Sequence, residues 1–287
     1  MYSLNKMKLT DIVNEAMVKK NKSSWVQPDL KPWMYQTKEE IEQWLKDSKI
    51  PGFVSKELEI HPTGKGLQLG NIFSKGPKET LVQYNGQWLL PVRFNMSPGD
   101  LEFNNLAIES MIGFPYVVLG RMILHDVAIE NFEGCPKLIQ GAANAWDGDI
   151  VIDSSKPIKS FVGCPDVKKI EVWTKVDGID GLPSTLLSLG LSHYTNIREI
   201  IGRCPKLQNL TLVVVKPGEN GLRPLDVFKS KVLNKIFFYP EDWSTNVIPN
   251  EYKEGNTIIN NHLASKERNI LACQEELIDN GLKNWAD

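Results

Sequence analysis

The chain has 287 residues and a formal net charge of −2, because 33 lysines and arginines nearly balance 35 aspartates and glutamates. This length suffices for one elongated domain with appended segments. The charge balance argues against electrostatic binding of nucleic acid, which needs a basic surface. The sequence has neither a long apolar run nor a secretory leader, so we expect an intracellular protein that does not span a membrane.

The first predicted element is an amphipathic helix over residues 7–18. Its apolar face, at the i, i+3, i+4, i+7 spacing of a helix, is formed by Leu9, Ile12, Val13 and Ala16. A polar linker rich in lysine, serine and asparagine follows. Residues 1–24 are therefore predicted to form an N-terminal helix and linker.

Residues 25–54 are predicted to form a capping helical segment. Thr37 and Glu40 have the spacing of a capping box, in which the hydroxyl accepts from the third helical N–H and the glutamate reaches back. The expected buried face of this helix consists of Ile41, Trp44 and Leu45. The helix is expected to stop by Pro51 and Gly52.

Residues 55–240 contain short segments with an apolar-x-apolar pattern, which is typical of strands. Six triplets share it: Leu101–Phe103, Met122–Leu124, Ile150–Ile152, Ile170–Val172, Leu189–Leu191 and Leu210–Leu212. Because side chains alternate along a strand, the outer residues of each triplet should face a core and the middle residue the opposite side. Three earlier stretches are predicted to start the same sheet and to cover its first strand: Leu58–Ile60, Leu67–Leu69 and Trp88–Leu90.

A second pattern comes after the triplets: an isolated isoleucine, then an apolar residue and a glycine-proline turn. Its copies are Ile129–Pro136, Ile158–Pro165 and Ile197–Pro205, with weaker copies at Ile108–Pro115 and Ile179–Pro183. They start 21, 29, 21 and 18 residues apart, and repetition at about 20–29 residues is typical of leucine-rich repeats. The alternative is a set of unrelated strands with coincidental turns. The five copies favour an α/β solenoid: an irregular leucine-rich-repeat-like parallel sheet with N-terminal and C-terminal helical caps.

The long step between two copies carries extra residues 140–149, and such insertions often form loops on a binding face. Cys135, Cys164 and Cys204 occupy equivalent positions in their copies. The C-x-x-C spacing of zinc sites is missing, and a disulfide is disfavoured in a reducing compartment. We therefore expect buried structural thiols.

Residues 241–287 are predicted to form a C-terminal capping helix. Ser265 is the expected N-cap and Gly281 the expected C-terminal glycine. The apolar residues of this helix are Ile270, Leu271, Leu277 and Ile278. The alternative is a detachable helix that binds a partner.

The sequence lacks recognisable catalytic chemistry. Its four histidines form no ligand pattern, and neither a complete phosphate-binding loop nor a nucleophile elbow occurs. Asp147 and Asp149 resemble paired carboxylates, but acidic residues beside glycine are common in solvated loops. We expect a non-enzyme with no catalytic residue, metal site or cofactor. An enzyme would need a cleft assembled by folding, such as an acidic pocket with His125 and Asp153.

The exposed face of the sheet is the predicted binding surface. The middle-triplet positions form one column, and positions two residues later form the next. The candidate partner-binding residues are Glu102, Asn104, His125, Asp153, Glu171, Trp173 and Ser192. Trp173 has the composition of an interface anchor. Alternatively, loops or helices cover this face, and Ile123, Val151 and Trp173 are ordinary buried residues.

The chain resembles the leucine-rich-repeat proteins of large tailed (T-even-type) bacteriophages. The resemblance covers residues 37 to 287 and is carried by the segments Thr37–Lys49, Leu90–Phe94, the isoleucine/glycine-proline copies and Ile270–Asp279. It implies the architecture and the source type but no defined reaction. The central copies are more irregular here than in that family. Separately, Ile12–Ala16 is similar to the targeting and cleavage peptides of proteins packaged into T-even-type heads, with Glu15–Ala16 as the cleavage point.

Together these observations predict an interaction module of phage origin that binds a host or viral protein through the sheet face. It would act in the host cytoplasm, without nucleic acid or membrane as partner. The alternatives are a structural or head-packaged component of the virion and an enzyme with an unrecognised cleft.

Overall fold

A computed structural model describes residues 30–70, 80–141, 149–214, 216–218, 221–241 and 248–286. The chain divides into the units Met1–Pro32 and Trp33–Asp287, and the described helices and strands all belong to the second unit. The predicted helix over 7–18 and its linker lie outside the described residues, as does Glu15–Ala16. The helix of the predicted capping segment 25–54 belongs to the same compact unit as the sheet. Among the described helices, none has the length and apolar content to cross a membrane.

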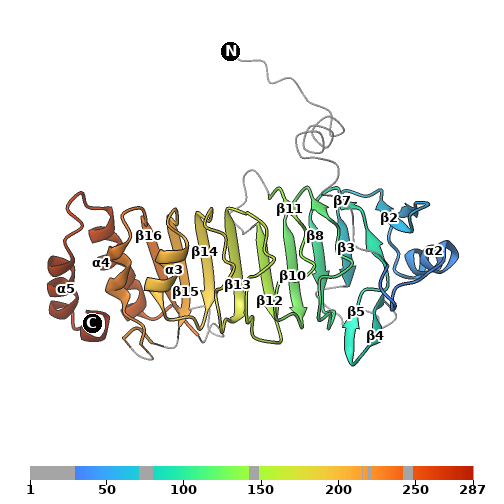
Figure 1. Ribbon diagram of the computed structural model, residues 1–287. Coiled ribbons are helices and arrows are strands. Elements are labelled where there is room, and N and C mark those ends of the chain that lie inside the picture. The colour runs from blue at the N-terminus through green and yellow to red at the C-terminus, as the bar shows by residue number, and fades with distance from the viewer. Residues whose placement is uncertain are drawn as a thin grey trace, which may run out of the picture. The chain divides into compact units, whose positions relative to one another are not determined.

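The second unit, Trp33–Asp287, is a mixed α/β structure built on an eight-stranded sheet. The strands of this sheet are all parallel and are arranged in chain order (Figure 1). Its strands are β3 (Leu67–Gly70), β8 (Leu101–Asn104), β10 (Met122–Val127), β12 (Ile150–Ser154), β13 (Lys169–Lys175), β14 (Ser188–Ser192), β15 (Asn209–Val214) and β16 (Lys235–Pro240). The six triplets predicted to be strands all lie in this sheet, and their parallel pairing is confirmed.

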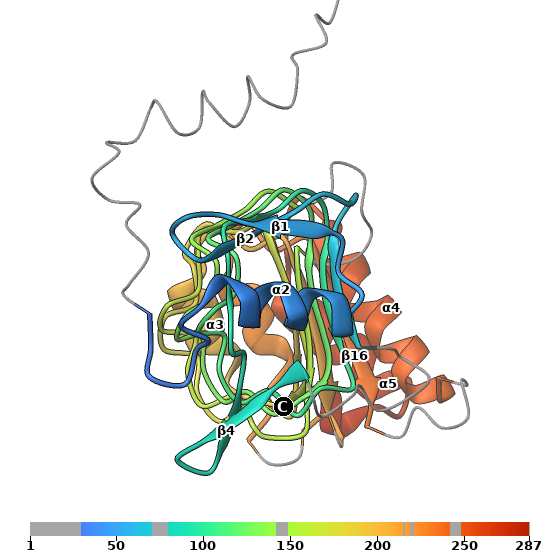
Figure 2. The ribbon, with the colours of Figure 1, turned by 90° about the vertical axis from the view of Figure 1, so that its right-hand side faces the viewer.

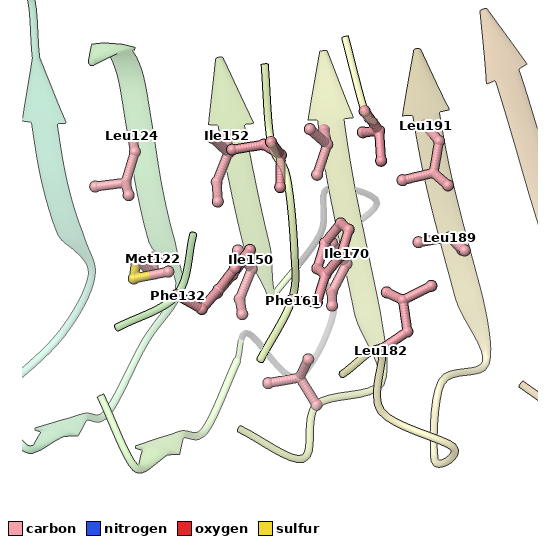
Figure 3. Close-up of a cluster of buried hydrophobic side chains, with 14 of the residues drawn as sticks. Met122, Leu124, Phe132, Ile150, Ile152, Phe161, Ile170, Leu182, Leu189 and Leu191 are labelled. Carbon is pink, nitrogen blue, oxygen red and sulfur yellow. The ribbon is translucent and has the colours of Figure 1, made fainter. Parts of the chain in front are cut away.

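The triplets pair in register, so equivalent positions lie side by side. Ile123, for example, is the partner of Glu102 on one side and of Val151 on the other. The outer residues of all six triplets are buried, none more than 1 % exposed. The predicted direction of the core is therefore confirmed, and Figure 3 shows outer residues of neighbouring strands projecting into it.

The isoleucine/glycine-proline copies close the core opposite the sheet. Each leading isoleucine is buried, as predicted. Phe132 and Phe161, three residues after their isoleucines, stack with ring centroids 5.0 Å apart and planes 25° apart (Figure 3). Gly163 has φ +96°, and a Cβ there would lie 2.7 Å from the carbonyl oxygen of Phe132. The glycine therefore serves both the left-handed turn and the close approach to the preceding copy.

The last copy forms a helix instead of a turn. Helix α3 (Ile197–Arg203) begins at the isoleucine, and the Asn196 side chain accepts from Glu199 N–H as its N-cap. This copy has one more residue, Arg203, between its glycine and Cys204. Its glycine, Gly202, is helical and a Cβ there would meet nothing within 4 Å. Figure 2 shows α3 and β16 on opposite sides of the unit.

Two of the three early strand stretches do not join the large sheet, contrary to prediction. Leu67–Leu69 does, as β3. β2 (Glu59–Pro62) instead lies between β1 (Gly52–Val54) and β6 (Arg93–Phe94). Trp88 lies in a hairpin of β4 (Val82–Tyr84) and β5 (Gln87–Leu89). Asn85 and Gly86 both have positive φ, as a two-residue hairpin turn requires, so this local turn determines the pairing.

A further small parallel sheet joins residues that precede the large strands. It consists of β7 (Met96–Ser97), β9 (Val117–Val118) and β11 (Leu138–Ile139).

Helix α2 (Lys38–Asp47) starts with the predicted capping box, in which Thr37 accepts from Glu40 N–H and the Glu40 carboxylate accepts from Thr37 N–H. Its predicted buried residues, Ile41, Trp44 and Leu45, are buried. The ring centroids of Trp44 and Phe94 lie 6.0 Å apart. The helix thus covers apolar residues near the first strands.

The described part of the C-terminal segment contains two α-helices, followed by a short 3-10 helix (Lys283–Trp285), where the sequence predicted one helix. The two α-helices are α4 (Asn250–Ala264) and α5 (Ile270–Asp279). Ser265 is therefore not the N-cap of α5; it is the C-cap of α4, and Asn269 accepts from Leu271 and Ala272 N–H at the start of α5. Gly281 ends α5 as predicted: its φ is +78°, and Leu282 N–H donates to Leu277 carbonyl oxygen, as in a Schellman motif.

Helix α4 covers the outer edge of β16 with two asparagine side chains. Asn256 accepts from Phe238 N–H at 2.8 Å and donates to Phe238 carbonyl oxygen at 2.9 Å. Asn260 does the same for Ile236, at 2.8 and 2.7 Å. Residues four apart on a helix and two apart on a strand both lie about 6–7 Å apart, so the two amides fit the backbone groups of two alternate residues on the free edge of β16. The edge-facing N–H and carbonyl groups of Ile236 and Phe238 are thus satisfied without a further strand.

The last residues of the chain pack against the same helix. Trp285 is buried, with its ring 5.4 Å from Phe238 and 5.6 Å from Tyr252 in edge-on arrangements. Gly255 makes this possible, because a Cβ there would lie 2.5 Å from the Trp285 ring.

Candidate functional site

The outer face of the large sheet carries one continuous row of side chains. This middle row consists of Gln68, Glu102, Ile123, Val151, Glu171, Gly190, Thr211 and Phe237. The predicted six-residue column is confirmed in register, and the structure extends it by one residue at each end. Most of its side chains are half-buried, but Val151 is only 8 % exposed.

The two glutamates of the middle row contact neighbouring residues of the same row. The Gln68 amide donates to the Glu102 carboxylate at 3.2 Å. The Glu171 side chain lies over Gly190, with its Cγ 3.4 Å from the position that a Cβ would occupy. Glycine therefore leaves room for the Glu171 stem.

The second predicted column is interrupted. Its Asn104 and His125 are register partners, but the register shifts between Leu124 and Val127 and again between Val172 and Lys175. Asp153 is exposed and His125 half-buried. These two residues come directly after the register partners Leu124 and Ile152.

Asn104 and Ser192 are not surface residues, which corrects their prediction as binding residues. They are 1 % and 2 % exposed. Each precedes a residue with positive φ, Asn105 at +54° and His193 at +59°. The chain bends sharply where β8 and β14 end, so strict alternation no longer holds there and these side chains are buried.

Trp173 lies in the predicted orientation. Val172 beside it is fully buried, and Trp173 is 37 % exposed. Of the inserted residues 140–149, residues 142–148, including Asp147, lie outside the described residues. The Asp149 carboxylate accepts hydrogen bonds from the N–H groups of Lys168 and Lys169, so it holds the start of the next strand.

The last strand of the sheet, β16, adds an aromatic end to the face that was not predicted from the sequence. Lys235 Nζ lies 4.8 Å from the centre of the Phe237 ring, and Tyr239 lies 6.0 Å from Phe237. The alternation in Lys235–Tyr239 was the available signal, because it resembles the other triplets.

The four cysteines are free thiols, as predicted. Cys135, Cys204 and Cys273 are buried, whereas Cys164 is half-buried. Loss of solvent raises the pKa of all four above the ordinary value of 9.0, to about 11 for Cys204 and about 12 for Cys273. In the part of the chain that the structure describes, His, Cys, Asp and Glu side chains form no group of three or more that could hold a metal.

The raised thiol pKa values predict slow alkylation of the folded protein. The thiolate is the reactive form, and burial disfavours it. At about pH 8, iodoacetamide should modify the native chain at least about tenfold more slowly than the chain in denaturant, as measured by mass spectrometry. Stability should also fall as the pH rises above 9.0, where thiols of the unfolded chain ionise and those of the folded chain do not. Rapid modification of Cys135 in the native protein would contradict this burial.

No family model matches the chain, and neither a curated protein nor a solved structure is significantly similar to it. Any function of the sheet face must therefore be inferred from its own side chains.

Proposed function

We propose that the chain is a leucine-rich-repeat-like solenoid of phage origin that binds a host or viral protein through the outer face of its sheet. It acts as a non-enzymatic interaction module in the host cytoplasm. The middle row carries this proposal: eight outward positions, one from each parallel strand, lie in register on one face. Such an array displays many side chains at fixed spacings, which suits recognition of a protein surface.

The composition of this face supports binding of protein. Trp173 and Phe237 are large aromatic residues at outward positions, and glutamates lie among them. Aromatic anchors surrounded by polar groups are typical of binding hot spots. The acidic residues disfavour nucleic acid, whose phosphates they would repel.

Trp173→Ala is expected to weaken binding of the partner by about 2 kcal/mol while changing the stability of the chain little. The ring is part of the outer face and its removal leaves the buried residues Ile170 and Val172 in place. Wild-type and variant chains would be used to capture proteins from phage-infected cells, with quantification by mass spectrometry. The affinity of each captured protein would then be measured with purified components.

Val162→Ala is the matched control, because Val162 is 63 % exposed in a turn away from the sheet. A partner retained by the control and lost by Trp173→Ala supports the proposal. If every captured protein binds all three chains equally, or Trp173→Ala chiefly lowers stability, the face is not the binding surface. Enrichment of the chain in purified particles would favour the virion component instead.

A further inference from the structure

The exposed large apolar residues of the chain concentrate near its C-terminal helices. Seven such side chains are exposed in the described ranges, and three of them lie singly, on β1, on β13 and in the turn after Phe161. The other four belong to α5 or to the turn before β16: Val232, Ile270, Leu271 and Ile278. These four residues are named the α5 surface. Scattered apolar residues are normal on a protein, whereas a group of them indicates an interaction site.

Helix α5 presents Leu271 and Ile278 in nearly the same direction, because seven residues make almost two full turns. They are 66 % and 43 % exposed. The buried residues Cys273 and Leu277 lie on the other side of the helix, and Ile270 lies between the two sides, 41 % exposed. Helix α5 lies at the end of the unit (Figure 1), so one of its sides packs on the protein and the other meets solvent.

Arg268 brings Val232 to the start of α5. Its Nη1 donates to the carbonyl oxygen of Ser230 at 2.6 Å, and its Nη2 donates to that of Leu233. These carbonyl groups flank Val232 in the chain, and Arg268 comes two residues before Ile270. The turn and the helix are therefore parts of one surface.

Charged residues of opposite sign border the α5 surface on opposite sides. Glu275 and Asp279 are exposed on α5, on the side of Leu271 that is away from Ile270. Lys231 is exposed in the turn, on the side of Ile270. Within the described ranges, none of these three charged residues has an ion-pair partner. An apolar centre with acid on one side and base on the other is complementary to itself across a two-fold axis.

We propose that two copies of the chain associate through the α5 surface as a two-fold symmetric dimer. The apolar residues of each copy contact those of the other, and Glu275 and Asp279 of each lie beside Lys231 of the other. A second copy matches both signs of charge, whereas a uniformly acidic or basic partner would leave one sign opposed. The middle row of the sheet is not part of this surface, so the dimer would display two outer faces.

The dimer should be weak, since four apolar residues form a small centre compared with the roughly 20–30 residues a side of a standard interface. Sedimentation velocity of the full chain, from about 5 to about 200 µM, covers this range of affinity. We expect the mass to rise with concentration toward twice that of the monomer. Leu271→Ser should weaken the dimer at least about tenfold. Val162→Ser is the matched control, because Val162 is similarly exposed, at 63 %, and lies in a turn away from α5.

Charge reversal tests the orientation of the two copies. The double variant Glu275→Lys/Asp279→Lys and the single variant Lys231→Glu should each dimerise at least about tenfold more weakly than the wild type, because like charges then face each other. A mixture of the two variants should form mixed dimers, since every pair across the axis is again of opposite sign. Native mass spectrometry distinguishes these mixed dimers by mass.

A chain that stays monomeric at the highest concentration, or a dimer that Leu271→Ser leaves intact, would overturn the inference. The absence of mixed dimers would refute the arrangement of charges. Loss of a captured protein in Leu271→Ser, without self-association of the wild type, would assign the α5 surface to a different partner and also contradict the dimer. The variants leave Trp173 unchanged, so these outcomes are independent of the proposed function of the outer face.

Discussion

Asn256→Ala is expected to lower the free energy of unfolding by about 3 kcal/mol, although it replaces a polar residue with a better helix former. The substitution leaves the N–H and the carbonyl oxygen of Phe238 without their partners at a buried edge. Each such group costs about 1–3 kcal/mol, whereas the gain in helix propensity is below about 1 kcal/mol. The loss of hydrogen bonds should therefore dominate.

Denaturant unfolding of the full chain measures this effect, with Asn261→Ala as the matched control. Asn261 lies on the same helix but is exposed, so its replacement should be neutral or slightly stabilising. Hydrogen exchange at the Phe238 amide provides a second readout, because it should become faster in Asn256→Ala alone. Similar stability of the two variants would show that the asparagine amide does not hold the edge of β16.

Gly163→Ala and Gly202→Ala should change stability in opposite directions, although both glycines occupy the same position in their sequence copies. Gly163 has φ +96°, and its Cβ would press on the Phe132 carbonyl oxygen. The expected loss is about 3 kcal/mol, from backbone strain together with the steric clash. Gly202 is helical with open space around it, so alanine should stabilise the chain by about 0.5–1 kcal/mol.

Thermal and denaturant unfolding of both variants would provide the comparison, with far-ultraviolet circular dichroism as a check that each chain folds. A loss of stability in Gly163→Ala would report the turn and its contact with the preceding copy. A gain in Gly202→Ala would report helix propensity alone. A destabilised Gly202→Ala would mean that the last copy has the same turn as the others and not a helix.

The sequence was sufficient to predict the strands of the large sheet other than β16, and the direction of their core. In Ile170–Val172 and its equivalents the alternation of apolar residues is local, and burial of one face allows a single register. The capping box at Thr37 and the terminal glycine at Gly281 were predictable for the same reason, since a few neighbouring residues determine them.

Features that depend on distant contacts were not predictable. The burial of Asn104 and Ser192 results from bends at the ends of their strands. Helix α4 was missed because its most important polar residues, Asn256 and Asn260, look like surface residues in the sequence. Their role depends on the edge of β16, which only the folded sheet provides.

The asparagine pair on α4 has a consequence for how the chain can change its length. The two amides bind only backbone atoms of β16, and a backbone offers the same groups whatever its side chains are. Duplication or loss of one strand with its following turn, between β10 and β15, would therefore leave the hydrogen bonds between α4 and β16 unchanged. The number of strands, and hence the width of the outer face, could therefore vary while the C-terminal helix α4 keeps the same contacts with β16.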